Sequence, residues 1–364
     1  MNKSSQHTFP DLEVSGTAFQ CGLQHGANLR DDIEHLVDYT LSLIDKGSRQ
    51  SKLRHAHKHL PFVEEYSPQV MAEMQGIAKG SGRSIDEVLL ISLHEELSGF
   101  SSSLSHSCTT FSATGRATRQ HISYLCQTWD ISPDLCSNAR PHIMQAQRED
   151  APNSLAFIYP GMIAGAGINS AGIAISWNSV PRLKIQPGVP TYVIIAEVLR
   201  QTTIGEALAA IFRAKSAGCF NFMLADETEI YSIEATPDKI GMLYSSHSLG
   251  HANHYVSDVL RMRQDIATVG QRHSASSIVR YYRVNRLLEE ADGEIDLAVC
   301  QNILQDHVNY PQSICRHKVA YLDARRSSAT CASWVIIPST RQWWVTRGPA
   351  CENPFVKYVL NDRN

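Results

Sequence analysis

The spacing of apolar positions divides this chain into a helical first part and a strand-rich second part. Apolar side chains recur at helical intervals over residues 15–46, 60–82 and 84–97, so the first hundred residues are expected to form helices and no strands. Pro68 is expected to kink the second helix, and Gly80 to Gly82 to end it. Residues 47–59 are polar and are predicted to form a solvated connection.

After residue 107 the pattern changes to short runs rich in β-branched and aromatic residues. Seven runs are predicted to be strands: 108–113, 121–129, 154–159, 172–180, 220–227, 229–236 and 239–246. Helical patterns interrupt or follow them at 191–201, 204–215, 277–291 and 296–307, and residues 328–347 read as a closing hairpin. This order predicts an α+β fold of two antiparallel sheets with helices outside, a four-layer αββα plan.

Composition narrows the class of protein without naming an activity. The chain has 364 residues, of which 43% are hydrophobic and 19% charged, so it can bury a large core. Its net charge of -3 and the lack of a basic block argue against a nucleic-acid partner. The polar N-terminus and the absence of a long apolar run predict neither a signal peptide nor a membrane partner.

Nine cysteines are scattered along the chain, at 21, 108, 126, 136, 219, 300, 315, 331 and 351. Their odd number and the absence of a CxxC pair argue against a disulfide framework and favour a reducing, cytoplasmic location. Most are expected to be small buried residues. Cys108 differs because it stands where the helical part meets the strand-rich part.

Seven blocks of sequence, in one order and over nearly the whole chain, carry a resemblance to a known family. They are GTAFQCGLQHG (Gly16–Gly26), GIAKG with SIDEVLLISLHEEL, CTT (Cys108–Thr110), WD (Trp129 and Asp130), GINSAGIAISWN (Gly167–Asn178), HANH (His251–His254) and NYPQSICR (Asn309–Arg316). In these blocks the chain resembles the acyl-coenzyme A:6-aminopenicillanate (isopenicillin N) acyltransferases, which are N-terminal nucleophile hydrolases. Ser107 stands where that family usually has glycine, and Thr128 where asparagine is expected.

The resemblance implies a precursor that cuts its own backbone between Ser107 and Cys108. A helical α piece, residues 1–107, and a catalytic β piece, residues 108–364, would then remain together as a heterodimer forming one structural domain. The cut would free the α-amine of Cys108. An ordinary α-amine has a pKa of about 7.7–8.0, which suits a base acting on a thiol whose ordinary pKa is about 8.5. One residue then supplies both nucleophile and base.

The matching positions imply roles for individual residues. Cys108 would be the nucleophile, Asp130 would hold its amine, the Asn253 amide would donate to the oxyanion, and Arg316 would pair with Asp130 or favour the thiolate. Thr109, Thr110 and Asn178 are assigned to substrate binding. The implied substrate is a small N-acyl amide, of an isopenicillin N or N-β-alanyl-amine type, or an acyl-coenzyme A thioester, with no cofactor.

Two other classes of protein remain open. A papain-like thiol hydrolase would pair Cys108 with His251 or His254, which lie at a comparable separation along the chain. A binding module of the same fold would keep an uncut chain and an unreactive Cys108. No metal site is predicted, because His251 and His254 have no cysteine or carboxylate at ligand spacing.

Overall fold

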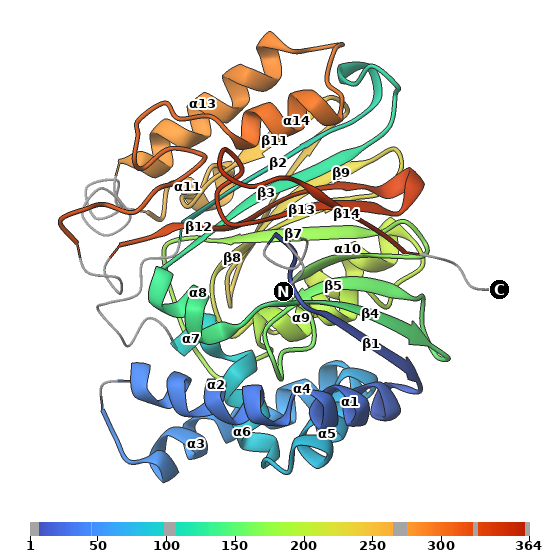
Figure 1. Cartoon of the computed structure of the whole chain (residues 1–364), viewed down its shortest axis with the longest axis vertical. Coiled ribbons are helices and arrows are strands. Elements are labelled where there is room, and N and C mark those ends of the chain that lie inside the picture. Colours follow the sequence, from blue (N-terminus) through green and yellow to red (C-terminus); the bar gives the residue numbers. More distant parts are fainter. Residues whose placement is uncertain (1–6, 45, 98–106, 265–274, 323–326, 361–364) are drawn as a thin grey trace.

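The computed structural model describes residues 7–44, 46–97, 107–264, 275–322 and 327–360, and these form four layers. Two β-sheets lie face to face in the middle of the molecule, and helices cover the outer face of each (Figure 1). The predicted α+β class and αββα layering are therefore confirmed. Residues 98–106, which precede the predicted cut, lie outside the described part of the chain.

The larger sheet has eight strands in the order β1-β4-β5-β6-β7-β8-β9-β10. Their bounds are β1 Asp11–Gly16, β4 His142–Arg148, β5 Ser154–Ile158, β6 Ala166–Asn169, β7 Ala174–Ser179, β8 Phe220–Ala225, β9 Ile230–Ala235 and β10 Ile240–Ser245. Neighbouring strands are antiparallel except for β1 and β4, which run parallel.

The smaller sheet has six antiparallel strands in the order β11-β2-β3-β12-β13-β14. Their bounds are β2 Ser107–Ala113, β3 Tyr124–Ile131, β11 Ser248–His251, β12 Ala329–Ile337, β13 Gln342–Arg347 and β14 Val356–Val359. β2 and β3 contact β7 and β8 of the larger sheet and also the helices within residues 276–304, so both faces of these strands are covered. This explains why β2 and β3 are buried at every position and do not alternate with polar side chains.

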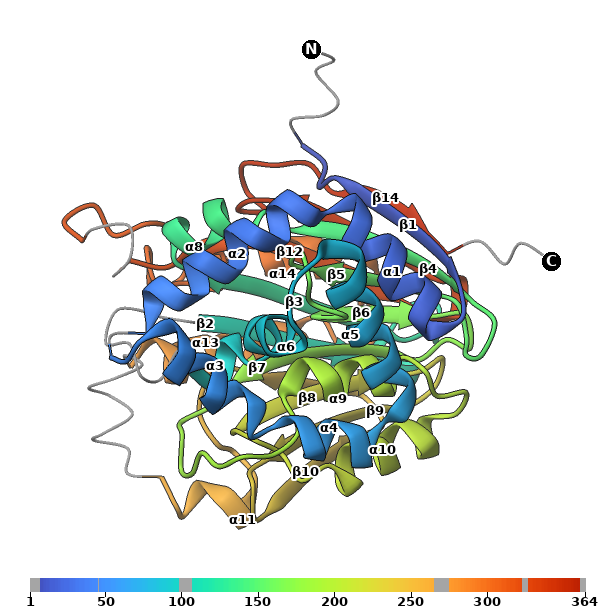
Figure 2. The ribbon, with the colours of Figure 1, turned by 90° about the horizontal axis from the view of Figure 1, so that it is seen from below.

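Helices form the two outer layers. The outer face of the smaller sheet carries α13 and α14, and the helices of the first hundred residues cover the opposite side of the molecule, as Figure 2 shows from below. The helices are α1 Ala18–Asn28, α2 Arg30–Leu43, α3 Arg49–His57, α4 Leu60–Tyr66, α5 Pro68–Ser81, α6 Ile85–Ser92, α7 His94–Leu97, α8 Pro133–Ala139, α9 Thr191–Val198, α10 Ile204–Arg213, α11 Asp258–Arg261, α13 Ser276–Glu290 and α14 Leu297–Leu304.

Local sequence features account for several helix ends. The capping box of Ser84 and Glu87 begins α6, and Gly82 ends α5 in the left-handed region at φ 71°. The chain breaks at Ser67 and resumes as α5 at Pro68, where a kink was predicted.

Two expectations about the first hundred residues are wrong. Residues 11–16 form strand β1, since alternation over six residues is a weak signal and its partner β4 lies far along the chain. The polar residues 47–59 contain helix α3, which presents only one buried side chain, Ala56, and therefore shows no apolar stripe.

Helices α1 and α5 pack backbone against backbone, which accounts for the glycines of two of the sequence blocks. A Cβ added to Gly76 would lie 2.2 Å from the Phe19 carbonyl oxygen, and one added to Gly22 would lie 2.0 Å from the Glu73 carbonyl oxygen. We therefore expect Gly76→Ala to lower the free energy of unfolding by about 1–3 kcal/mol, since overpacking forces the helices apart.

The matched control is Gly205→Ala in α10, where nothing lies within 4 Å of the added Cβ. That change should stabilise the protein by roughly 0.5–1 kcal/mol through lower backbone entropy in the unfolded chain. Urea unfolding of the two variants measures both effects. Equal stability of the two variants would show that the close helix contact is not a constraint.

One pair of cysteines departs from the expectation of reduced thiols. Cys136 of α8 and Cys331 of β12 form a disulfide, and the register of β12 against β3 shifts around Cys331, which marks it as a bulge residue. The two cysteines are 195 residues apart in sequence, so the spacing of cysteines along the chain could not show that they lie close together. The other seven cysteines, all within the described residues, are free thiols.

Among the described residues, no helix combines the length and the apolar character needed to cross a membrane.

Candidate active site

Cys108 lies at the start of β2, in the interior between the two sheets. The residue is 3% exposed, and it pairs with Trp129 of β3, while Ser107 pairs with Asp130. Because β2 and β3 are antiparallel neighbours, the CTT and WD blocks come side by side. The Cys108 backbone N–H donates to Asn253 Oδ1 at 3.0 Å, which brings in the HANH block as well.

Asp130 is fully buried beside this strand end. Thr330 Oγ1 donates to Asp130 Oδ1 at 2.7 Å, and the Arg316 Nε atom lies 3.9 Å from Asp130 Oδ2. Burial raises the pKa of Asp130 to about 6, although the positive charges of Arg316 and Arg280 act in the opposite direction. Asp130 therefore changes its charge close to neutral pH.

Arg316 is held from several sides. Its Nη1 donates to Ser328 Oγ at 3.1 Å, its Nη2 donates to Ser276 Oγ at 2.9 Å, and its backbone N–H donates to Thr330 Oγ1 at 2.9 Å. Thr330 thus touches both members of the predicted Asp130–Arg316 pair. The two charged groups are close, but the separation of 3.9 Å is longer than a hydrogen bond.

Arg280 of α13 is a central residue that the sequence analysis did not find. Its Nη1 donates to the Cys108 carbonyl oxygen at 2.6 Å and to Thr109 Oγ1 at 2.9 Å, and its Nη2 donates to Asn253 Oδ1 at 2.8 Å. Burial, and then the like charge of Arg316, lower the pKa of Arg280 to about 9. The guanidinium fork therefore joins the backbone of the predicted nucleophile to the side chain of Asn253.

Asn253 turns its acceptor atom, rather than its donor group, toward Cys108. Its Oδ1 accepts from both the Cys108 N–H and the Arg280 guanidinium, and these two donors fix the orientation of the amide. Its Nδ2 donates to the Ser179 carbonyl oxygen at 2.9 Å. The predicted role as oxyanion donor would require this Nδ2 to be released, and it stays a prediction.

The Cys108 thiol is enclosed and protonated in the continuous chain. Burial, followed by the negative charge of Asp130, raises its pKa to about 12. Two cavities open elsewhere on the surface, of about 550 and 500 Å³, and Cys108 lines neither of them. In this structure the thiol is therefore neither ionised nor open to solvent.

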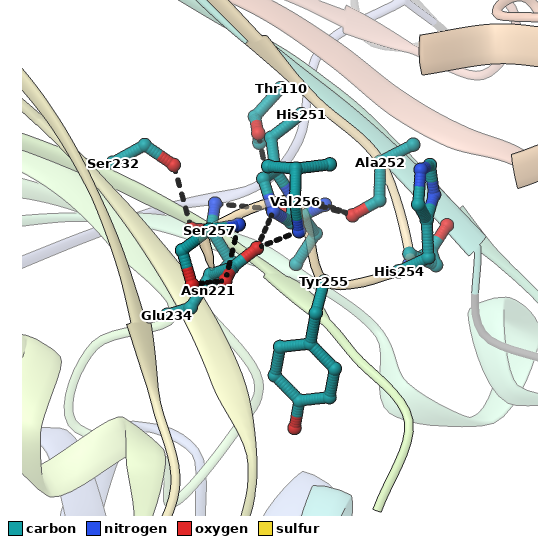
Figure 3. Close-up of polar contacts among 12 residues, drawn as sticks. Thr110, Asn221, Ser232, Glu234, His251, Ala252, His254, Tyr255, Val256 and Ser257 are labelled. Atoms are coloured by element: carbon teal, nitrogen blue, oxygen red, sulfur yellow. Dashed lines mark hydrogen bonds and ion pairs between the residues drawn. The ribbon is translucent and has the colours of Figure 1, made fainter. Parts of the chain in front are cut away.

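Beneath the site, a buried polar network joins the two sheets (Figure 3). Asn178 Oδ1 accepts from Thr110 Oγ1 at 3.1 Å and from Asn221 Nδ2 at 3.0 Å, and Asn178 Nδ2 donates to the Ala252 carbonyl oxygen. The Thr110 contact joins the two sheets, the Asn221 contact lies within the larger sheet, and together with Ala252 these partners occupy the polar atoms of Asn178. Their assignment to substrate binding, with that of Thr109, remains a prediction.

The same network fixes the segment that carries Asn253. His251 Nε2 and Glu234 Oε1 lie 2.8 Å apart, and both side chains are fully buried. Glu234 also accepts from the Val256 N–H at 2.7 Å and from the Ser257 hydroxyl at 2.5 Å, as Figure 3 shows. Burial acts to raise the pKa of Glu234, but the hydrogen bonds and charge of His251 outweigh it and lower that pKa. Glu234 is thus an ionised anchor for residues 251–257.

Neither histidine of the HANH block is placed as a papain-like base. His251 is engaged by Glu234 and the Ala252 carbonyl oxygen, and His254 Nδ1 lies 2.8 Å from Ser277 Oγ. Burial, together with the charges of His251 and Arg280, lowers the pKa of His254 to about 4, so it is neutral at pH 7. The contacts of both rings are to structural partners, which does not favour the papain-like alternative.

The chain is 24% identical over 365 residues to the acyl-coenzyme A:6-aminopenicillanic-acid-acyltransferase 40 kDa form of Emericella nidulans, covering 97% of this chain and 96% of that protein. It is also similar in structure to a mutant of conjugated bile acid hydrolase from Clostridium perfringens. That match has a TM-score of 0.49 and 12% identity, and covers 71% of this chain and 93% of that one.

A third similar structure is penicillin V acylase from Agrobacterium tumefaciens, with a TM-score of 0.41, 13% identity, and coverage of 65% of this chain and 82% of that one. Family membership rests on sequence, since residues 117–349 match the acyl-coenzyme A:6-aminopenicillanic acid acyl-transferase family. That match spans more than half of the chain and includes the Asp130, Asn253, Arg280 and Arg316 positions. The chain therefore belongs to the acyl-coenzyme A:6-aminopenicillanic acid acyl-transferase family.

Proposed function

We propose that this protein is a self-processing cysteine enzyme that hydrolyses or transfers the acyl group of a small N-acyl compound through a thioester on Cys108. Family membership supports acyl transfer or amide hydrolysis as the reaction class. The self-cleavage, the cysteine nucleophile and the assignment of residues are our proposal.

One observation carries this proposal. The backbone N–H of Cys108 donates to Asn253 Oδ1, and Arg280 bridges the same Asn253 oxygen to the Cys108 carbonyl oxygen. Polar groups are therefore already arranged around the nitrogen that would become a terminal amine. A buried structural cysteine needs no such arrangement of its backbone, since an ordinary strand partner satisfies it.

The cut would proceed by an acyl shift. The Cys108 sulfur attacks the Ser107 carbonyl carbon and loses its proton, the peptide C–N bond breaks, and the Cys108 nitrogen takes up a proton. Water then hydrolyses the resulting thioester, which leaves a carboxylate on Ser107 and restores the thiol. Both residues are nearly buried, so release of the new chain end would open a path to the sulfur.

The freed amine would then act as the base. It accepts the thiol proton, the thiolate attacks the acyl carbon of the substrate, and the proton passes to the departing amine or thiol. Asn253 Oδ1 would orient the Cys108 amine, and the ionised Asp130 would strengthen it as a base. Water or a second amine completes the cycle, so hydrolysis and transfer differ only in the group that attacks the thioester.

Intact-mass spectrometry combined with a substrate panel tests this function. The purified protein should show two pieces, one that ends at Ser107 and one that begins at Cys108. A panel of N-acyl amides and acyl-coenzyme A thioesters, scored for released amine or free thiol, should reveal turnover that tracks the cut fraction. An active protein whose chain is intact would contradict the proposal.

The dependence of kcat/KM on pH tests two groups that the proposal requires to be deprotonated, the Asp130 carboxyl group and the α-amine of Cys108. Asp130, with a pKa of about 6, is ionised only above that pH, and an α-amine becomes neutral above its ordinary pKa of about 7.7–8.0. Below both pKa values, log(kcat/KM) should rise by about two units per pH unit. In Asp130→Asn the slope should fall to about one, and kcat/KM should drop by roughly 10²-fold or more.

The control is Asp238→Asn, which removes a partly exposed carboxylate paired with Arg263. It should keep the wild-type slope and rate. An unchanged acid limb in the cut Asp130→Asn protein would exclude Asp130 from the catalytic ionisation.

A further inference from the structure

A cluster of two histidines and two cysteines lies outside the site described above. His307, Cys315 and His317 belong to the loop after α14, and Cys351 belongs to the loop between β13 and β14. Each residue offers one ligand atom, and all four of these atoms lie within 4.8 Å of one another. Neither the proposed reaction nor the fold requires this convergence.

The separations among these atoms are close to those of a coordination shell. His307 Nε2 and His317 Nε2 are 3.0 Å apart, and Cys315 Sγ and Cys351 Sγ are 3.5 Å apart. His317 Nε2 lies 3.7 Å from Cys315 Sγ and 3.4 Å from Cys351 Sγ. A tetrahedral Zn²⁺ with Zn–S near 2.3 Å and Zn–N near 2.0 Å sets its ligand atoms about 3.3–3.8 Å from one another. The three separations that involve sulfur lie in this range, and the two imidazole nitrogens are slightly closer together.

Hydrogen bonding cannot account for the arrangement. Three polar atoms approach the single atom His317 Nε2, yet an imidazole nitrogen has either one proton or one lone pair to offer. Thiols are also weak donors and weak acceptors. A cation at the centre gives all four atoms a favourable partner at once.

The surroundings orient the ligands as in protein metal sites. The other nitrogen of His317, Nδ1, lies 3.4 Å from Glu352 Oε1, and a carboxylate in this position favours the tautomer whose Nε2 faces a metal. The Cys315 N–H donates to the Asp306 carbonyl oxygen at 3.0 Å, and the His317 N–H donates to the Pro311 carbonyl oxygen at 2.9 Å. Backbone hydrogen bonds therefore hold these ligands in place.

We infer that His307, Cys315, His317 and Cys351 form a structural Zn²⁺ site. Both thiols would lose their protons and both imidazoles would bind in the neutral form, so the two thiolates balance the charge of the ion. Two sulfur and two nitrogen ligands in a tetrahedral arrangement favour zinc over the harder cations. With four protein ligands no coordination position is left for water or substrate, which marks the site as structural rather than catalytic.

The site would fix the segment that delivers Arg316. This residue stands between the ligands Cys315 and His317, and its guanidinium reaches inward to Ser276 and Ser328, near Asp130. Zinc would tie this segment to the loop after β13. This consequence for catalysis rests on the proposed function, whereas the metal site itself does not.

Metal analysis of the full chain tests the inference. We expect elemental analysis of dialysed protein to give one Zn²⁺ per chain, and protein loaded with Co²⁺ instead to show the visible absorption of tetrahedral thiolate coordination. Cys351→Ser and His307→Ala should each lose the metal and lower the Tm. Because His307 is exposed, its truncation leaves the core intact if Cys351→Ser fails to fold.

The matched controls change the same residue types elsewhere. Cys219→Ser, in a separate small core cluster, and His247→Ala, on an exposed turn, should keep the full zinc content. Metal content well below one per chain in the wild type, or unchanged in the two ligand variants, would overturn the inference. A Cys315–Cys351 disulfide in alkylated, unreduced protein would overturn it too. Zinc bound by a chain that shows no turnover would count against the proposed function alone.

Discussion

Replacement of Cys108 by alanine should leave a single uncut chain with no measurable turnover. The change removes the sulfur that we propose attacks the Ser107 carbonyl carbon, and it would thereby also prevent formation of the terminal amine. Removing the nucleophile of such an enzyme lowers kcat by at least about 10³-fold, because the remaining groups stabilise the transition state without forming the covalent intermediate. Intact-mass spectrometry and the substrate panel measure the two losses separately.

The matched control is Cys126→Ala, a second buried cysteine in the same sheet, on β3. This variant should be cut and active, although the smaller side chain will reduce its stability. A Cys108→Ala protein that still appears as two pieces would show that another agent cuts the chain. A Cys108→Ala protein that is active would remove the sulfur from the mechanism.

Arg280→Met should have the second largest effect. The change removes three hydrogen bonds from a buried cation to Cys108, Thr109 and Asn253. Each bond to a charged group is worth about 1.5–3 kcal/mol, so loss of two or more predicts a fall in processing rate or kcat/KM of at least about 10²-fold. Methionine fills much of the same volume, which limits the cost in stability.

The pH dependence separates an electrostatic role of Arg280 from a packing role. The positive charge of Arg280 lowers the pKa of Asp130, so its removal should move the acid limb of the profile to higher pH. Arg280→Lys keeps the charge but not the fork, and it should restore the position of the limb without restoring the rate. Arg286→Met, an exposed position on the same helix, is the control and should behave as wild type.

Sequence patterns predicted the elements that have a strong local signal. The closing hairpin and the helices α9, α10, α13 and α14 were found because their apolar stripes or alternations are long and bounded by turn residues. Strands β1, β4, β6, β11 and β14 were missed. They have four to seven residues each, and for β1 and β11 a partner far away in the sequence, rather than local propensity, makes them strands.

The residues of the candidate site also divide into those with a clear sequence signal and those without one. Cys108, Asp130, Asn253 and Arg316 could be named from the sequence blocks, and the structure gathers them at one end of β2 and β3. Arg280 lies outside those blocks, but a signal existed, because it falls on the same helix stripe as the buried residues Val284 and Leu288. An arginine on an apolar stripe predicts a buried ionic contact.

The His307–Cys351 cluster had a weaker signal. His307, Cys315 and His317 are close in sequence, but their spacing matches no common zinc motif. The fourth residue, Cys351, lies in the loop between β13 and β14, and it comes close to the other three only when the smaller sheet has formed. The orientation of Asn253 is a similar case, since the blocks could name the residue but not which end of its amide would face Cys108.

The parallel pairing of β1 with β4 has a consequence for the two pieces that the proposed cut would leave. The six residues of β1 would belong to the N-terminal piece, yet they form the edge strand of a sheet whose other strands would belong to the C-terminal piece. The buried Arg148–Glu73 ion pair would also link the two pieces. Separating them would expose sheet edge, charge and core together, so we expect the two pieces to stay associated unless the whole protein unfolds. Such a dimer would not exchange its halves with other copies, and each cut molecule would keep the partner with which it was translated.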